Sequence, residues 1–197
     1  MAEAMLTAWV PGQPIELETE NYYLRTLTPA DVTPSYVAWA KDPDVMEGLN
    51  LPPRDISRER LQKYVQTFDG KSRFHLGIFD RKDDRFIGFY AVYTERAHKL
   101  GNINVVVGDR AYWGKKVVLE TRAAIIDFLF DRIGCDKVWG MPVARNLPSV
   151  FNYQAQGYSC EGVLKKHRVS PRGERVDQYV FGLLKEDWKA RKKGRGS

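Results

Sequence analysis

The stretch from Val105 to Glu120 constrains the fold of this chain more than any other. Three consecutive valines end at Gly108, which is typical of a β-strand. A polar turn follows, and from Val117 apolar or small residues recur at helical spacing: Val117, Thr121, Ala124, Ile125, Phe128 and Leu129. Gly134 then suits the left-handed residue just past a helix end. The sequence therefore predicts a strand that leads through a turn into a helix.

The turn between this strand and this helix is a candidate anion site. The first amides of a helix have no partner within the helix, and the helix dipole places partial positive charge there. Arg110, Lys115 and Lys116 would add full charges. An ordinary strand-to-helix connection with a solvated charge cluster is the alternative interpretation.

Length and composition indicate one globular domain. The chain has 197 residues, of which 43% are hydrophobic and 28% charged. No apolar run approaches the ~20 residues of a membrane span. Residues 1–10 lack the basic start and apolar core of a secretory signal. Cys135 and Cys160 lack metal-ligand spacing and are more typical of buried thiols than of a disulfide. We therefore expect a cytoplasmic protein that does not bind membranes.

The basic charge is concentrated at the C-terminus. The net charge is +6, and from Lys185 onward six Lys or Arg residues accompany two acidic ones. The sequence predicts a disordered, solvated tail over 189–197. A nucleic-acid contact, such as ribosome association, is the less favoured alternative.

The order of elements predicts a mixed α/β domain built on one sheet. Strands are expected over 21–27, 73–79, 86–93, 102–107, 137–143, 158–168 and 175–184. Helices are expected over 32–40, 57–68, 117–133 and 148–155, with a short one near 43–46.

Several short motifs in this order resemble a known family. They are Leu24–Asp31, Asp42–Val45, Tyr112–Lys115 with Glu120, Asn146–Ser149, Gly157-Tyr158, Glu161-Gly162, Asp177 and Leu183–Trp188. Together they resemble the GNAT superfamily of acyl-CoA-dependent N-acyltransferases, and most of all its RimJ/RimL branch. The resemblance covers about residues 15–188, which leaves 1–14 as an N-terminal extension and 189–197 as a basic tail.

The resemblance implies a mostly antiparallel sheet, flanked by helices, in which two central strands splay apart. It also implies direct transfer of an acetyl group from acetyl-CoA to a primary amine, without a metal. In such proteins the turn before the central helix holds the CoA pyrophosphate, and the preceding strand pairs with the pantetheine arm. The corresponding positions here are Asn104, Val105, Val106, Val107, Arg110, Tyr112, Trp113, Gly114, Lys115, Lys116, Val117, Asn146 and Ser149. The alternative for Asn146 is helix capping before Pro148.

One departure from the family pattern concerns the turn. The family usually has Gly-x-Gly where this chain has Gly114-Lys115-Lys116. Glycine at the second position lets the backbone approach phosphate closely. Either Lys116 contacts a phosphate itself, or the turn has partly lost CoA. A non-catalytic acyl-CoA sensor on the same fold is therefore the alternative function.

Tyr153 matches the tyrosine that many GNAT enzymes use as a general acid, with packing beneath the sheet as the alternative. No general base is evident. The usual glutamate position holds Asn102 or Asn104, Glu120 is more typical of a structural residue, and His75 of a strand face. A low-pKa amine is easier to use without a base, which favours an N-terminal α-amine or an amino sugar over lysine. Residues 32–68 and the loop near 170–174 are expected to form the acceptor pocket of a monomer or homodimer.

Overall fold

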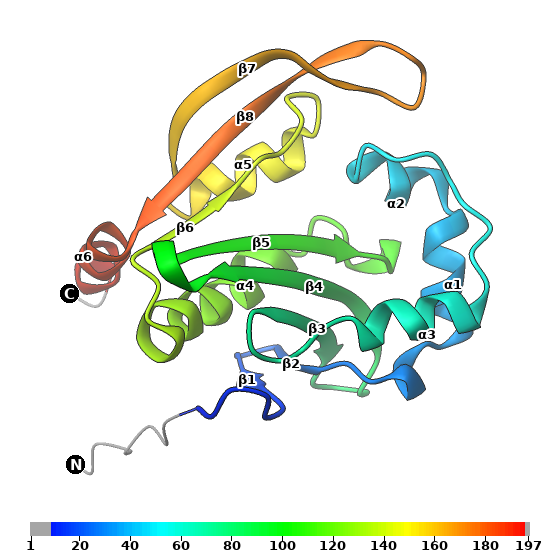
Figure 1. The fold of residues 1–197 in the computed structure, drawn as a ribbon, viewed down its shortest axis with the longest axis horizontal. Coiled ribbons are helices and arrows are strands. Elements are labelled where there is room, and N and C mark those ends of the chain that lie inside the picture. Colours follow the sequence, from blue (N-terminus) through cyan, green and yellow to red (C-terminus); the bar gives the residue numbers. More distant parts are fainter. Residues whose placement is uncertain (1–8, 196–197) are drawn as a thin grey trace.

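The computed structural model describes residues 9–195, and these form one mixed sheet with helices on both faces (Figure 1). The eight strands lie in the order β1-β2-β3-β4-β5-β6-β8-β7. Their bounds are β1 Glu16–Glu18, β2 Tyr22–Thr26, β3 Arg73–Asp80, β4 Phe86–Glu95, β5 Leu100–Val107, β6 Lys137–Gly140, β7 Ser159–Val169 and β8 Arg175–Leu184. All neighbouring strands are antiparallel except β5 and β6, which are parallel. The predicted fold class is confirmed.

Six α-helices accompany the sheet in this part of the chain. They are α1 Pro34–Lys41, α2 Pro43–Gly48, α3 Arg58–Gln66, α4 Val117–Phe128, α5 Leu147–Ala155 and α6 Lys185–Arg195. A π-helical turn, Leu129–Ile133, extends α4 to Gly134, whose φ of 84° is left-handed as predicted.

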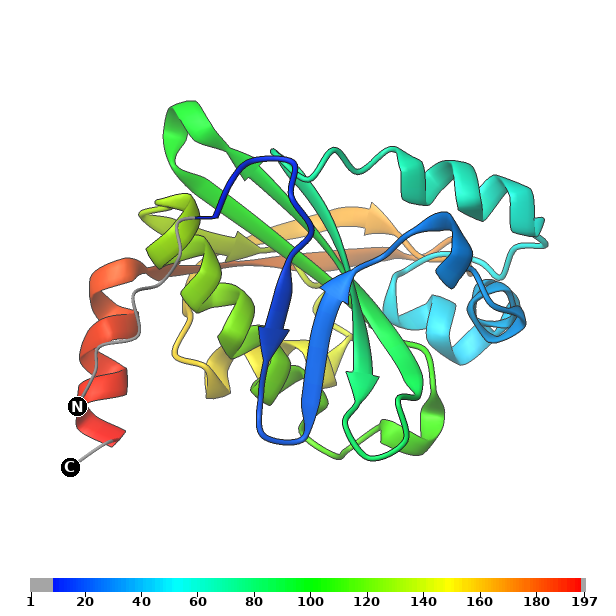
Figure 2. The same ribbon diagram turned by 90° about the horizontal axis from the view of Figure 1, so that it is seen from below.

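The alternation of β3 divides the core into two clusters. Phe74, Leu76 and Ile78 face α4 and pack there with Ile125 and Leu129. Phe79 belongs to the opposite cluster, which is built with α1 and α3 around Val32, Tyr36, Trp39 and Leu61. Figure 2 shows α4 and the α1–α3 helices on opposite sides of the strands. Both faces of the central strands are therefore covered, which explains the continuous apolar run in β4.

The sheet opens between β5 and β6. β5 pairs with β4 along its whole length, but it pairs with β6 only from Leu100 to Asn102, opposite Lys137 to Trp139. β6 ends at Gly140, three residues earlier than predicted, and Pro142 follows without an N–H to donate. The β7–β8 hairpin lies across the resulting opening from β5 (Figure 1). The splayed central pair is confirmed.

Both ends of the described chain pack on the domain. Trp9 makes edge-to-face contacts with Phe74 and Phe128, at 5.6 and 5.7 Å between ring centroids. The prediction of a disordered tail is wrong for residues 189–195, which continue α6. Trp188 is buried, and its Nε1 donates to Asp127 at 2.8 Å. The basic composition of this segment did not indicate a packed helix, because Trp188 is the one large apolar residue in it.

Candidate active site

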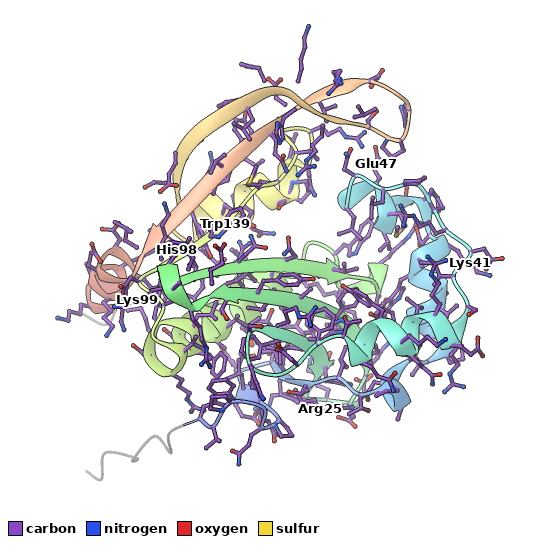
Figure 3. The ribbon with its side chains drawn as sticks, in the orientation of Figure 1. Arg25, Lys41, Glu47, His98, Lys99 and Trp139 are labelled. Carbon is purple, nitrogen blue, oxygen red and sulfur yellow. The ribbon has the colours of Figure 1, made fainter. Side chains whose placement is uncertain are left out.

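The opening between β5 and β6 leads into a cleft of about 950 Å³. Its walls are the free edge of β5, the start of α4, α5 and the segment that follows β6. Helix α2, the residues after it and the end of β7 lie opposite. In Figure 3, Trp139 lies at the closed end of the opening and Glu47 lies on α2 at its far side. Of the predicted cofactor residues, those that line the cleft are Asn104, Val105, Val106, Val107, Tyr112, Trp113, Gly114, Lys116, Val117, Asn146 and Ser149.

The turn before α4 has two left-handed residues, Gly114 with a φ of 76° and Lys116 with a φ of 59°. The first backbone bond of the helix runs from the Glu120 amide to the Lys116 carbonyl. The amides of residues 116–119 therefore have no helical acceptor and lie at the positive end of the helix dipole. Lys116 thus keeps the backbone conformation that glycine would have adopted.

The other two basic residues of the turn are engaged elsewhere. Arg110 forms salt bridges with Asp42 and Asp44, the latter at 2.5 Å, at the start of α2. Lys115 lies over the Tyr112 ring, 5.0 Å from its centroid. Neither side chain lines the cleft, so the predicted site gains direct charge from Lys116 alone among these three.

Tyr112 and Trp113 attach the turn to the sheet. The Tyr112 hydroxyl donates to Asp80 at 2.7 Å, and Trp113 Nε1 donates to the Val107 carbonyl at 2.8 Å. Burial, followed by the Asp80 carboxylate, raises the pKa of Tyr112 to about 12. These bonds fix where the helix amides point relative to β5.

Asn102 and Asn104 occupy the fork between the two strands. Asn102 Nδ2 donates to the Trp139 carbonyl at 3.2 Å, across the last strand pair. Asn104 Nδ2 donates to Asn102 Oδ1 at 2.6 Å. An amide cannot take a proton usefully, so this pair organises the fork and provides no base.

Tyr153 lies directly beside this fork. Its ring stacks on Phe181 with centroids 5.1 Å apart, and its hydroxyl is 3.5 Å from the Ile103 carbonyl oxygen. A Cβ on Gly140 would lie 1.9 Å from that hydroxyl, so glycine is required there. Burial raises the pKa of Tyr153, and the neighbouring Arg122 opposes this effect. The packing and the acid interpretations of Tyr153 are compatible, because its ring is buried while the residue lines the cleft.

Asn146 caps α5. Its Oδ1 accepts from the Ser149 amide at 3.1 Å, and its Nδ2 donates to the Gly48 carbonyl at 2.8 Å. Nearby, Arg145 Nη2 donates to Asn50 Oδ1 at 2.8 Å. Asn146 therefore caps α5, as the alternative interpretation predicted, and its side chain also connects α5 to the end of α2.

The candidate bases are unsuited to the role. Asp44 is the single carboxylate among the described residues that line the cleft, and Arg110 pairs with it. Glu120 accepts bonds from Thr19 Oγ1 and the Asn21 amide, at 2.6 and 2.7 Å. Burial raises the pKa of Glu120, but these hydrogen bonds outweigh it and the net pKa is lowered. Glu120 therefore holds the β1–β2 turn against α4, as its structural interpretation predicted.

His75 and the two cysteines take no part in the cleft. His75 is buried on a sheet face, with the Phe68 ring centroid 4.5 Å from its own, and this burial lowers its pKa to about 3. Cys135 is buried and Cys160 is exposed, and both are free thiols. The expectation of a buried thiol is therefore wrong for Cys160, whose place near the start of edge strand β7 exposes it.

Sequence reasoning missed Arg122 and Gln156. Arg122 lines the cleft from α4 and donates through Nε to Oε1 of Gln156, the residue that follows α5. Arg122 precedes Ile125 by three residues and Leu129 by seven, so helical spacing places it on the apolar face. A charged residue on that face was the available signal.

Within residues 9–195, no three His, Cys, Asp or Glu side chains gather closely enough to hold a metal ion. The same range contains no helix long and apolar enough to cross a bilayer.

Comparisons with known proteins agree with this geometry. A family model described as an acetyltransferase (GNAT) domain matches residues 21–158. The probable N-acetyltransferase YjcK of Bacillus subtilis is 24% identical over 179 residues, covering 87% of this chain and 98% of its own. The uncharacterized N-acetyltransferase p20 of Bacillus licheniformis is 28% identical over 181 residues, covering 87% and 97%.

A solved structure shares the fold. The spermidine N-acetyltransferase of Vibrio cholerae, in complex with CoA and spermine, superposes with a TM-score of 0.77. It is 16% identical in sequence, and the match covers 86% of this chain and 98% of that one. Since the family model spans well over half of the chain, and the relatives match along nearly their full length, the protein belongs to the GNAT family of acyltransferases.

Proposed function

We propose that this protein transfers an acetyl group from acetyl-CoA directly to a primary amine. The observation that carries the proposal is one continuous surface in the cleft. It joins the edge of β5 that has no strand beside it, from Ile103 to Val107, to the open amides at the start of α4. A linear ligand with a peptide-like arm and a pyrophosphate matches both parts, because the strand edge offers hydrogen bonds and the helix start attracts anions.

The residues divide the binding task by position. The backbone from Asn104 to Val107 would pair with the pantetheine arm, and the amides from Gly114 to Val117 would hold the pyrophosphate. Lys116, which is exposed at the cleft, would add a charge-assisted contact to a phosphate. The CoA in the Vibrio cholerae complex supports a CoA donor for this fold.

Two groups beside the fork between β5 and β6 would carry out the acetyl transfer. A backbone N–H on the free edge of β5 would polarise the thioester carbonyl as charge develops on its oxygen. Tyr153 would then protonate the departing thiolate. A phenol of reference pKa ~10 is a weaker acid than a thiol of pKa ~8.5, so this transfer needs assistance from neighbouring groups. Both groups flank the Ile103 carbonyl, where the two strands separate.

The acceptor is an amine that is already partly neutral. The described cleft offers Asp44 as its single carboxylate, and Arg110 occupies it. An α-amine near ~7.7–8 is partly unprotonated at pH 7, whereas a lysine near ~10.4 is not. We therefore propose a protein N-terminal α-amine or an amino sugar as the acceptor class.

Thermal unfolding with acetyl-CoA tests the proposal. Ligand at about 100 times its Kd adds about 2.7 kcal/mol of stability, which is about 5–10 °C in Tm for a chain of this size. Release of free CoA thiol with a panel of amines separates an enzyme from the non-catalytic sensor. No shift in Tm at millimolar acetyl-CoA would remove both functions, and a shift without turnover of any amine would favour the sensor.

A further inference from the structure

Arg122 is the largest fully buried side chain of the described protein, with 1% of its surface exposed. It lies on the second turn of α4 and lines the cleft together with Tyr153. Guanidinium groups stay charged in proteins, and a buried charge is costly unless an anion compensates it. The groups around Arg122 therefore indicate which anion its charge could stabilise.

No carboxylate of the described residues forms a salt bridge with Arg122. Its Nε donates to the neutral Gln156 Oε1, and its Nη2 has no hydrogen-bond partner. Two phenol side chains lie beside the guanidinium group. The guanidinium carbon is 4.4 Å from the Tyr153 ring centroid and 5.5 Å from that of Tyr158. The charge thus faces aromatic rings instead of a permanent anion.

We propose that Arg122 is a positioning residue for Tyr153, holding its ring beside the fork and stabilising the phenolate that proton donation leaves behind. The inference rests on the proposed acetyl transfer with Tyr153 as acid. A cation near a developing anion lowers the cost of forming it, most of all in a site that excludes water. The lowering effect of Arg122 on the pKa of Tyr153 agrees with this geometry.

The proton and electron balance of the step is complete. The amine nitrogen forms a bond to the carbonyl carbon, and the carbon–sulfur bond breaks with its electron pair on sulfur. The Tyr153 proton passes to that sulfur, giving the free thiol and a phenolate beside Arg122. The new amide nitrogen releases its proton to solvent, and the phenolate regains one from solvent.

A purely structural role for Arg122 has a basis, because Gln156 also donates to the Leu119 carbonyl at 3.1 Å and so connects α5 to α4. The test must therefore remove the charge without leaving a buried polar group unpaired. The double variant R122M/Q156L replaces both partners with apolar side chains of similar size, a change that proteins often tolerate. R122Q removes the charge and keeps a neutral amide N–H as a hydrogen-bond donor beside Gln156.

We expect kcat to fall about tenfold in both variants, because proton transfer follows the acidity of the donor and a neighbouring charge shifts a pKa by about one unit or more. The KM for acetyl-CoA should stay unchanged, since the binding surface on β5 and α4 is intact. Placing 3-fluorotyrosine at position 153 makes the phenol more acidic and should restore most of the lost kcat. A structural defect would gain no more from fluorine than the parent protein gains.

Three outcomes would overturn the role of Arg122. They are an unchanged kcat in both charge-removing variants, a loss that 3-fluorotyrosine does not restore, or an equal further loss when the substitutions are made in Tyr153→Phe. The failure of the proposed function looks different. In that case the parent protein shows no turnover, or Tyr153→Phe alone retains the parental kcat.

Discussion

At Lys116 the residue type departs from the family pattern, but the backbone has a left-handed conformation that glycine readily adopts. Its φ of 59° is left-handed, a conformation that costs a non-glycine residue about 1–2 kcal/mol. Gly114, two residues earlier, is left-handed as well, and a Cβ there would meet nothing within 4 Å. The turn therefore carries conformational strain at Lys116 that a phosphate contact could offset.

Substitutions at Lys116 separate its charge from its backbone. Lys116→Gly should raise the free energy of unfolding by up to about 1 kcal/mol, because relief of strain exceeds the entropy of the added glycine. Lys116→Ala should leave stability nearly unchanged. If Lys116 contacts phosphate, both variants should bind CoA about tenfold more weakly, the loss of roughly 1.5 kcal/mol from one charge-assisted contact.

Gly114→Ala provides the matched control, with an expected loss of about 1 kcal/mol from backbone strain alone. Urea unfolding and calorimetric titration with CoA would measure the two effects. Tighter CoA binding by Lys116→Gly, with Lys116→Ala neutral, would show that the lysine obstructs the turn.

The Tyr153 hydroxyl can be removed or displaced by two independent substitutions. Tyr153→Phe deletes the proton donor and should lower kcat about 10²-fold, with little change in the KM for acetyl-CoA. Gly140→Ala adds a methyl group where the hydroxyl lies, 1.9 Å from its oxygen, and should lower kcat by pushing the phenol away. Steady-state kinetics would check both, and a parental kcat in Tyr153→Phe would assign protonation to water.

At the scale of elements, the strands with clear alternation could be predicted and the ends of the chain could not. β3 places Phe74, Leu76 and Ile78 on one face because its period of two is unbroken. β1, from Glu16 to Glu18, has three residues and follows Pro11 and Pro14 in the sequence. Such a strand is too short to show an alternating pattern. Arg110 pairs with Asp42 at the start of α2 and not with the cleft. These two residues are 68 positions apart in the sequence, so local spacing could not predict the contact.

The β3 strand also carries a buried histidine whose protonation opposes folding. His75 is 1% exposed, and the Tyr36 hydroxyl is 3.4 Å from its Nε2. Burial lowers its pKa from 6.5 to about 3 in the folded state. Between these values the unfolded chain binds a proton that the folded one does not, so stability is lost as pH falls below 6.5.

We expect this residue to contribute a loss of about 1.4 kcal/mol for each pH unit below 6.5. His75→Leu should flatten that slope between pH 6.5 and 5.5, a range in which carboxylates of ordinary pKa remain largely ionised. His98→Leu, at an exposed position, is the control and should keep the parental slope. Urea unfolding at several pH values would check this, and an equal slope in His75→Leu would assign the pH dependence to other groups.

At the scale of the whole molecule, the cleft is open at one end, and strand pairing closes it at the other. β5 and β6 still pair at Leu100–Asn102, and α6 packs beside this closed end (Figure 1). Lys189 pairs with Asp131 at 3.2 Å, and Lys192 pairs with Asp127 at 2.8 Å. Lys189 and Lys192 thus compensate acidic residues of the same molecule, which a count of charges along the sequence does not reveal.

Deleting residues 189–197 should therefore reduce stability more than it changes nucleic-acid binding. The deletion removes both ion pairs and the bond from Arg191 Nη2 to the Ala155 carbonyl at 2.7 Å. Exposed ion pairs contribute little each, so the total loss should be about 1–2 kcal/mol, or roughly 2–8 °C in Tm. The variant K189Q/K192Q retains the helix and isolates the two ion pairs, with a smaller expected loss. Calorimetry and salt-dependent RNA binding would measure both properties. A truncated protein with parental Tm that has lost salt-sensitive RNA binding would instead assign α6 to a nucleic-acid partner.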